Sequence, residues 1–310
     1  MADRRLQVFH AVAKHRSFTK AADALCMTQP AVTFQIHQLE GHFNTRLFDR
    51  ASGRIALTPA GVIALEYVER ILPLYAELDA RVKDLTGQEV GPLTIGASTT
   101  IAEFLLPRIL GEFKARHTGV VPKLVVANSE VVQEQVAERS LDLGFIEGDS
   151  HLPTLVTDIC CEDELQVICA PQHPLAHRDE VSLETLITHP YIGRESGSGT
   201  REVIDHHLKK AGLSPKAMQV SMEATSPEAL KGLVATGIGF AIMSRVAAEK
   251  EVRLGDLVRI PIAPPLIRHL SAVYPKERMH PKIVTEFVRF AKERLATAGT
   301  TEDRRTVVER

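Results

Sequence analysis

The sequence predicts an α/β protein with a small helical N-terminal domain, one long helix and a larger region of alternating strands and helices. Residues 1–57 show short amphipathic helices, and residues 58–87 show a single helical pattern. Residues 91–295 alternate strand and helix patterns, which is typical of a largely parallel sheet. Residues 296–310 have little apolar content and are expected to be disordered.

The composition favours a soluble cytoplasmic protein. Hydrophobic residues make up 44% and charged residues 25% of the chain, as in ordinary globular proteins. No signal-like segment is present, and the longest near-apolar run, residues 232–243, is shorter than a membrane span. The cysteines show no CxxC pair and no zinc spacing, so we expect reduced thiols, no metal site and no cofactor. They are Cys26, Cys160, Cys161 and Cys169.

Charge is unevenly distributed along the chain. Residues 1–60 carry 8 Lys/Arg against 4 Asp/Glu, whereas the rest of the chain carries 29 against 35. A basic end on an acidic body favours a polyanionic partner for the N-terminal domain.

Two short helices are expected first. The apolar face of the first is formed by Leu6, Phe9, Val12 and Ala13. Thr19 is expected to cap the second helix. That helix would pack through Ala21, Ala22 and Leu25, because the small alanines allow close approach.

A third helix is expected to begin at Thr28, which would cap it, and its buried stripe is Val32, Ile36 and Leu39. This is the layout of a helix-turn-helix, whose second helix presents its N-terminal residues to the major groove. Amides and hydroxyls match base edges, although a generic exposed helix pair is the alternative reading. The candidate DNA contacts in this helix are Thr28, Gln29, Pro30, Thr33, Phe34 and His37.

The stretch at residues 47–61 is typical of a β-hairpin wing. Arg50 and Arg54 lie at its tip, where guanidinium groups can bind DNA phosphates. Thr58 is expected to cap the following helix, with Pro59 at its first position.

The long helix carries apolar residues at alternating spacings of three and four, the pattern of a coiled-coil seam. These are Val68, Ile71, Tyr75, Leu78, Val82 and Leu85. The alternative is a helix lying on its own domain. Pro73 removes one backbone hydrogen bond, so we expect a kink there.

At this point the chain resembles the LysR-type transcriptional regulators. The resemblance rests on FxxVAxxxSFTxAAxxL (9–25), TQPAVTxQIxxLE (28–40) and LFxRxxxxxxLTxAG (47–61). It implies double-stranded promoter DNA as a partner, a homodimer formed through the long helix, a homotetramer, and RNA polymerase as a further candidate partner. Phe34 departs from the family, which more often has Arg or another polar residue there; its ring could contact a thymine methyl instead.

Hydroxyl-rich helix starts follow strands in the larger region. Residues 91–98 read as a buried strand that leads into Ser98, Thr99 and Thr100, and such a helix start can bind an anion. Plain N-capping is the alternative, and it is favoured for Ser98 alone. A second start, in the segment 191–205, has two glycines that allow inward-pointing amides. Its candidate residues are Ser196, Ser198, Thr200 and Arg201, and Thr225 begins a third such helix start.

The resemblance extends more loosely over residues 91–295 and implies a periplasmic-binding-protein-like effector domain with two α/β lobes. The expected boundaries are residues 91–163 and 267–295 for lobe one and 164–266 for lobe two. The helix starts would face each other across a cleft, and family position brings Glu147 to its rim. The GSGTR motif resembles that of regulators that sense small anions, including regulators of carbon fixation and sulfur assimilation. The candidate effector-binding residues are Ser98, Thr99, Thr100, Glu147, Ser196, Ser198, Thr200, Arg201 and Thr225.

Three functional classes remain: a ligand-responsive transcription factor, an enzyme on a binding-protein-like fold such as a dehydratase or transferase, and a plain binding protein. Catalysis requires an acid–base pair or an activated nucleophile. His206 and His207, the Cys160–Cys161 pair and Glu147 provide neither, so no catalytic residue is assigned. The helix-turn-helix, the wing and the basic N-terminus favour the transcription factor.

Overall fold

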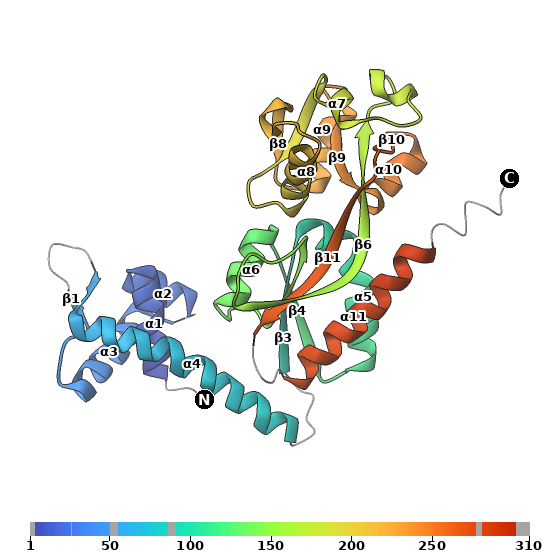
Figure 1. Cartoon of the computed structure of the whole chain (residues 1–310). Coiled ribbons are helices and arrows are strands. Elements are labelled where there is room, and N and C mark those ends of the chain that lie inside the picture. The colour runs from blue at the N-terminus through green and yellow to red at the C-terminus, as the bar shows by residue number, and fades with distance from the viewer. Residues whose placement is uncertain (1–3, 26, 50–54, 86–90, 277–280, 302–310) are drawn as a thin grey trace. The chain divides into compact units, whose positions relative to one another are not determined.

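The computed structural model describes residues 4–25, 27–49, 55–85, 91–276 and 281–301 (Figure 1). The chain divides into two compact units, Met1–Gln88 and Glu89–Arg310. None of the described helices is both long enough and apolar enough to cross a membrane.

The first unit is a winged helix-turn-helix domain. Its elements are α1 (Arg4–His15), α2 (Phe18–Ala24), α3 (Gln29–Phe43), β1 (Phe48–Asp49), β2 (Ala56–Leu57) and α4 (Pro59–Leu85). The expected apolar stripes form its core: Phe9 and Val12 of α1 are fully buried, as are Val32 and Ile36 of α3.

The helix ends show two correct cap predictions and one wrong one. Thr58 precedes α4, and its Oγ1 accepts from the Gly61 N–H at 3.0 Å. Thr28 caps α3, and its Oγ1 accepts from the Ala31 N–H at 3.4 Å. The prediction of Thr19 as the cap of α2 is wrong, because Ser17 is the cap and accepts from the Lys20 N–H at 3.2 Å. Ser17 has the extended backbone that a cap requires, whereas Thr19 already lies within the helix.

Local contacts fix the position of the wing. The Glu40 Oε1 accepts from the backbone N–H groups of Leu47 (2.8 Å) and Phe48 (3.3 Å), which joins the end of α3 to the start of β1. A Cβ on Gly61 would stand 2.1 Å from the Leu47 carbonyl oxygen, so only glycine fits beneath the wing. The tip with Arg50 and Arg54 lies outside the described residues.

The long helix α4 runs through Pro73 to Leu85, and its expected seam is mostly exposed. Val68 is buried in the core of the domain. The alternative, a helix that lies on its own domain, therefore holds only at the start of the apolar stripe. Ile71, Leu78 and Val82 are 40%, 54% and 52% exposed. Most of the apolar seam therefore has no cover within its own domain.

The second unit contains a seven-stranded sheet and a separate two-stranded sheet. The sheet strands are β3 (Gly91–Ala97), β4 (Val120–Val126), β5 (Leu143–Glu147), β6 (Leu155–Cys169), β9 (Ala241–Ser244), β10 (Val258–Ile260) and β11 (Leu266–Pro275). The smaller sheet pairs β7 (Pro190–Arg194) with β8 (Gln219–Ala224) in parallel.

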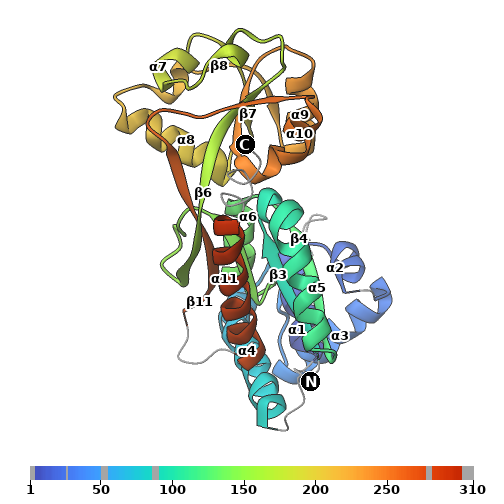
Figure 2. The same ribbon diagram turned by 90° about the vertical axis from the view of Figure 1, so that its right-hand side faces the viewer.

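Helices cover these sheets in two groups, which Figures 1 and 2 show as two lobes joined by β6 and β11. One lobe contains a π-helical turn (Ile101–Leu105), α5 (Leu106–Arg116), α6 (Ser129–Ala137) and α11 (Lys282–Thr301). The other contains α7 (Leu183–Leu186), α8 (Gly199–Lys210), α9 (Pro227–Ala235), α10 (Glu249–Leu254) and 3₁₀ turns at Pro174–His177, Pro215–Ala217 and Arg245–Ala248. The last helix, α11, reaches Thr301 and so enters the segment 296–310 that was expected to be disordered.

The expectation of a largely parallel sheet is correct for only part of the fold. Strands β3, β4 and β5 are parallel, but β6 pairs antiparallel with β9, β10 and β11. The physical reason is that β6 leaves the first lobe and β11 returns to it, so these neighbours must run in opposite directions. Their register pairs Leu165 with Leu266 and Cys161 with Leu270, at the junction of the two lobes.

Each lobe has its own apolar core. Phe113, Phe145 and Phe287 pack in the first lobe, and the rings of Phe113 and Phe287 lie 4.9 Å apart between centroids. Tyr191 and Phe240 pack in the second. Phe104 of the first lobe packs against a core cluster of the second, and buried polar side chains lie beside it at the junction.

Candidate functional site

The residues proposed for DNA contact lie along one side of α3. Gln29, Phe34 and His37 are exposed, as are Thr28 and Pro30, while Thr33 is half-buried. The Gln29 Nε2 donates to the Thr33 Oγ1 at 2.9 Å, which orients the amide on the helix surface. Phe34 is 59% exposed, so its ring has no role in the core.

At the lobe junction of the second unit, Glu147 is the centre of a buried polar network. This carboxylate, at the end of β5, accepts from the Ser98 hydroxyl at 3.1 Å and from the Thr200 hydroxyl at 2.8 Å. The Arg268 Nη1 lies 2.8 Å from its Oε2. Thr200 begins α8 in the second lobe, so the network joins the two lobes.

Arg268 has a second carboxylate partner. Its Nε donates to the Asp163 Oδ2 at 2.8 Å, and the Asp163 Oδ1 accepts from the Ser244 hydroxyl at 2.7 Å. The Arg268 side chain is fully buried, and its Nη1 also donates to the Thr200 Oγ1 at 2.8 Å. One guanidinium therefore binds carboxylates from β5 and β6 and a hydroxyl from α8.

The charges of this network are mutually stabilised. Burial acts to raise the pKa of Glu147, but Arg268 and the hydroxyls of Thr100 and Thr200 outweigh it, and the pKa lies below its ordinary value. Burial acts to lower the pKa of Arg268, but Glu147 and Asp163 outweigh it, so this pKa is raised. Both groups are charged at neutral pH.

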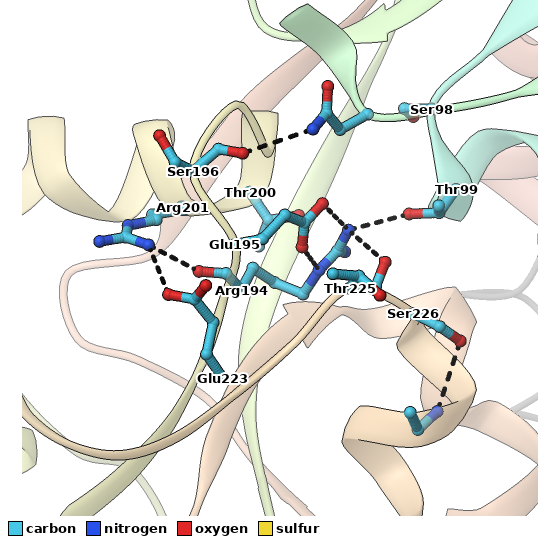
Figure 3. A network of polar contacts seen from close by, with 12 residues as sticks. Ser98, Thr99, Arg194, Glu195, Ser196, Thr200, Arg201, Glu223, Thr225 and Ser226 are labelled. Atoms are coloured by element: carbon cyan, nitrogen blue, oxygen red, sulfur yellow. Dashed lines mark hydrogen bonds and ion pairs between the residues drawn. The ribbon is translucent and has the colours of Figure 1, made fainter. Parts of the chain in front are cut away.

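Arg194, at the end of β7, is a second buried cation, and its side chain is 4% exposed. Figure 3 shows its bidentate ion pair with Glu195. The Arg194 Nε lies 2.8 Å from the Glu195 Oε2, and the Nη2 lies 3.0 Å from Oε1. The Nη2 also donates to the Thr99 Oγ1 in the first lobe (3.1 Å) and to the Thr225 carbonyl oxygen in the second (3.3 Å).

The remaining predicted residues divide into two groups. Thr100 and Ser198 are buried with the network, and the Ser198 Oγ has no hydrogen-bond partner among the described residues. Ser196 and Thr225 are exposed. The Arg201 Nη1 pairs with Glu223 at 2.8 Å and donates to the Arg194 carbonyl oxygen at 3.1 Å. Of the expected anion donors, Ser98 and Thr200 are thus already bound to a carboxylate of the chain itself.

Sequence reasoning missed Arg194, Asp163 and Arg268. Two signals could have found them. Arg268 and Asp163 are ionisable residues in the segments expected to cross between the lobes, and such residues need a buried partner. Arg194 stands at a strand end directly before a glycine-rich helix start.

A π-helical turn, Ile101–Leu105, directly follows the helix start at Thr99 and Thr100. Such turns are frequent at functional sites. Here it brings Phe104 against the core of the second lobe, and the Lys231 Nζ lies 5.1 Å from the centroid of its ring.

Among the described residues, no group of three or more His, Cys, Asp or Glu side chains is arranged to hold a metal ion. Cys160, Cys161 and Cys169 are free thiols. Burial, with smaller contributions from neighbouring charges, raises the pKa of Cys160 to about 11 and that of Cys161 to about 12.

Comparison with known proteins places both units in one family. Residues 4–62 match the bacterial regulatory helix-turn-helix protein family of the lysR type, and residues 86–296 match the LysR substrate binding domain. A probable RuBisCO transcriptional regulator of Synechocystis is 35% identical over 92% of this chain and 84% of its own. CysL of Bacillus subtilis, an HTH-type transcriptional regulator, is 34% identical over 80% of this chain and 82% of its own.

A solved structure extends the comparison to the second unit. The regulatory domain of Synechocystis CcmR, in complex with 2-PG, has a TM-score of 0.60 and 25% identity over 66% of this chain and 96% of that domain.

Proposed function

Because the chain belongs to the LysR family of transcriptional regulators, we propose that a small anionic metabolite, bound at the lobe junction, modulates its binding to promoter DNA. The observation that carries this proposal is the convergence of two buried arginines, Arg194 and Arg268, with the start of α8. The buried Ser198 hydroxyl there has no hydrogen-bond partner in the part of the chain that the structure describes. A ligand with a carboxylate or phosphate matches these donors.

Exposed side chains of α3 support the DNA-binding half of the proposal. Gln29 and its neighbours read base edges, while Arg50 and Arg54 bind phosphates and set the position of the domain on the duplex. The base contacts are Thr28, Gln29, Pro30, Thr33, Phe34 and His37. Phe34 contacts a thymine methyl through its exposed ring.

The exposed seam of α4 supports a homodimer, since Ile71, Leu78 and Val82 have no cover within their domain. Family membership extends this to a homotetramer that contacts RNA polymerase in the cytoplasm. For the second unit we retain residues 91–163 with 267–295 as lobe one and 164–266 as lobe two. The separate cores and the pairing of Leu165 with Leu266 support these boundaries.

The named ligand of the CcmR domain supports the class of effector. The two chains share a fold and a family, and 2-PG carries the anionic groups that arginine and helix-start donors bind. The proposed effector site consists of direct contacts and of residues that support them: Ser98, Thr99, Thr100, Glu147, Ser196, Ser198, Thr200, Arg201 and Thr225, together with Arg194 and Arg268. Ser98, Thr200 and Arg268 act indirectly, through Glu147.

The protein has no catalytic role in this proposal. The raised pKa values of Cys160 and Cys161 keep both thiols protonated at neutral pH, so neither is an activated nucleophile. Glu147 is held as an anion by Arg268 and is poorly suited to act as a general acid.

The test uses the full chain, a labelled DNA fragment from upstream of its own gene, and 2-PG as the probe anion. Affinity for DNA should fall steeply with salt, because phosphate contacts release counterions, and it should change when 2-PG is added. Ser198→Ala should weaken 2-PG binding about tenfold, because it removes a hydrogen bond to a charged group. Ser140→Ala is the control, because this exposed serine precedes β5, at the end of the strand remote from Glu147. Equal effects of the two variants would remove Ser198 from the site, and DNA binding indifferent to 2-PG and other small anions would refute the proposal.

A further inference from the structure

Every cation at the lobe junction, among the residues that the structure describes, already has a carboxylate partner. Arg268 lies between Glu147 and Asp163, and Arg194 faces Glu195. An incoming anion therefore meets no free positive charge. It can bind a guanidinium only where the resident carboxylate can leave.

The carboxylates of Arg268 cannot leave. Glu147 and Asp163 project from strands, and their side chains are only 2% and 7% exposed. Each also accepts from buried hydroxyls, Glu147 from Ser98 and Thr200 and Asp163 from Ser244. Releasing either therefore breaks several buried contacts at once. Arg268 is therefore a fixed part of the junction.

Arg194 is different, because its partner stands at the edge of the interior. The Glu195 side chain is 13% exposed and begins a turn in which Ser196 is exposed and Gly197 has a positive φ of 82°. Rotation of the Glu195 side chain can move the carboxylate into water. Arg194 would stay in place, because Thr99 and the Thr225 carbonyl hold its Nη2 from the two lobes.

The contact between Arg194 and Glu195 also has the geometry of a ligand contact. Two nitrogens of the guanidinium meet the two carboxylate oxygens at 2.8 and 3.0 Å (Figure 3). A carboxylate or phosphate ligand forms the same fork. Three residues further on, at the start of α8, the buried Ser198 hydroxyl has no partner among the residues described and supplies an independent donor.

We propose that Arg194 receives the anionic group of the effector and that Glu195 is a built-in counter-ion, which the effector displaces. This inference rests on the proposed function and adds how its site is regulated. The internal carboxylate lowers apparent affinity, because only the fraction of molecules with Glu195 turned outward is competent to bind. It also excludes uncharged analogues, which cannot replace a carboxylate on a buried guanidinium.

The site also connects ligand binding to both lobes. Arg194 bonds to Thr99 in one lobe and to the Thr225 backbone in the other, so exchange of its counter-ion acts on a contact that the lobes share. A ligand whose second end reaches Ser198 would favour one lobe arrangement over another.

The experiment is calorimetric titration of the full chain with 2-PG and, separately, with inorganic phosphate. Glu195→Gln should raise affinity about tenfold, because it removes the competing charge. Glu195→Asp keeps the charge, but its side chain is too short to bind both nitrogens of Arg194. The affinity of this variant should lie between that of Glu195→Gln and that of the wild type. Arg194→Gln should lower affinity about a hundredfold. Glu202→Gln is the control: this acid lies on the first turn of α8 and pairs with His151, and it should change affinity less than twofold.

The outcomes separate the two proposals. If wild type binds 2-PG and Ser198→Ala weakens it, but Glu195→Gln and Arg194→Gln bind like wild type, the counter-ion exchange is wrong, and the proposed effector site remains at Ser198 without Arg194. If Glu195→Gln and Glu202→Gln raise affinity equally, the effect is one of overall charge and the exchange is again wrong. If neither wild type nor Glu195→Gln binds either anion, both proposals fail.

Discussion

Replacing Glu147 by glutamine removes one charge from the network around Arg268 and keeps the side-chain shape. Removing one partner of a buried ion pair costs about 3–5 kcal/mol. Here Asp163 remains on the guanidinium and the new amide can still accept from Thr200, so we expect about 3 kcal/mol, the lower end. In a unit the size of Glu89–Arg310 this lowers Tm by about 6–12 °C.

Differential scanning calorimetry of the full chain measures this change in the transition of the larger unit. Glu162→Gln is the matched control, because Glu162 is 73% exposed and its carboxylate lies no closer than 3.9 Å to the Nε2 of His269. Its free energy of unfolding should change by less than about 0.5 kcal/mol. If Glu147→Gln and Glu162→Gln have the same Tm, the buried pair of Glu147 and Arg268 does not stabilise the lobe junction and the reasoning fails.

The same variant has a pH signature. The pKa of Glu147 is lowered in the folded state, so its stabilising effect is complete above its ordinary value of 4.5 and disappears as the pH falls through the folded pKa. Wild type should therefore lose stability below pH 4.5 more steeply than Glu147→Gln. Parallel curves of Tm against pH would contradict the charge assignment.

Three further predictions concern other parts of the chain. Gln29→Ala should relax the base preference in DNA binding. Arg54→Ala should weaken binding to all DNA sequences alike and reduce the slope of log affinity against log salt concentration by about one. Fluorescence anisotropy with labelled operator variants distinguishes the two results. Leu78→Asp should shift the protein towards monomer in light scattering, because it places a charge in the exposed seam, while Val62→Asp, off the seam, should not. Native Cys161 should react slowly with iodoacetamide at pH 8, since its pKa is raised to about 12. Fast alkylation measured by mass spectrometry would show that the pKa of this thiol is not raised in solution.

Much of the first unit could be predicted from sequence because its determinants are local. The apolar stripe of α3 and the cap at Thr28 lie within a few residues of the contacts they make. The cap of α2 shows the limit of this reasoning. Ser17 and Thr19 have the same chemistry, and only the backbone conformation decides which one caps the helix.

The lobe junction could be predicted only in outline because its contacts are distant in sequence. Serine and threonine at helix starts are visible locally, and those at Ser98 and Thr200 do converge. What they converge on is not local: Glu147 and Arg268 meet because β11 returns beside β5. The sequence of neither segment indicates that it contacts the other. Local patterns alone therefore predict that the hydroxyls bind an external anion.

The different surroundings of Arg268 and Arg194 explain how the lobe junction can be rigid at one point and respond to a ligand at another. A buried guanidinium needs an anion in every state of the protein, because an unpaired charge in the interior is too costly. Whether a ligand can provide that anion depends on where the resident carboxylate can go. Glu147 and Asp163 are buried and are held by further hydroxyl groups, so Arg268 joins β5, β6 and β11. Glu195 borders an exposed turn, and the same chemistry at Arg194 therefore becomes an exchangeable site.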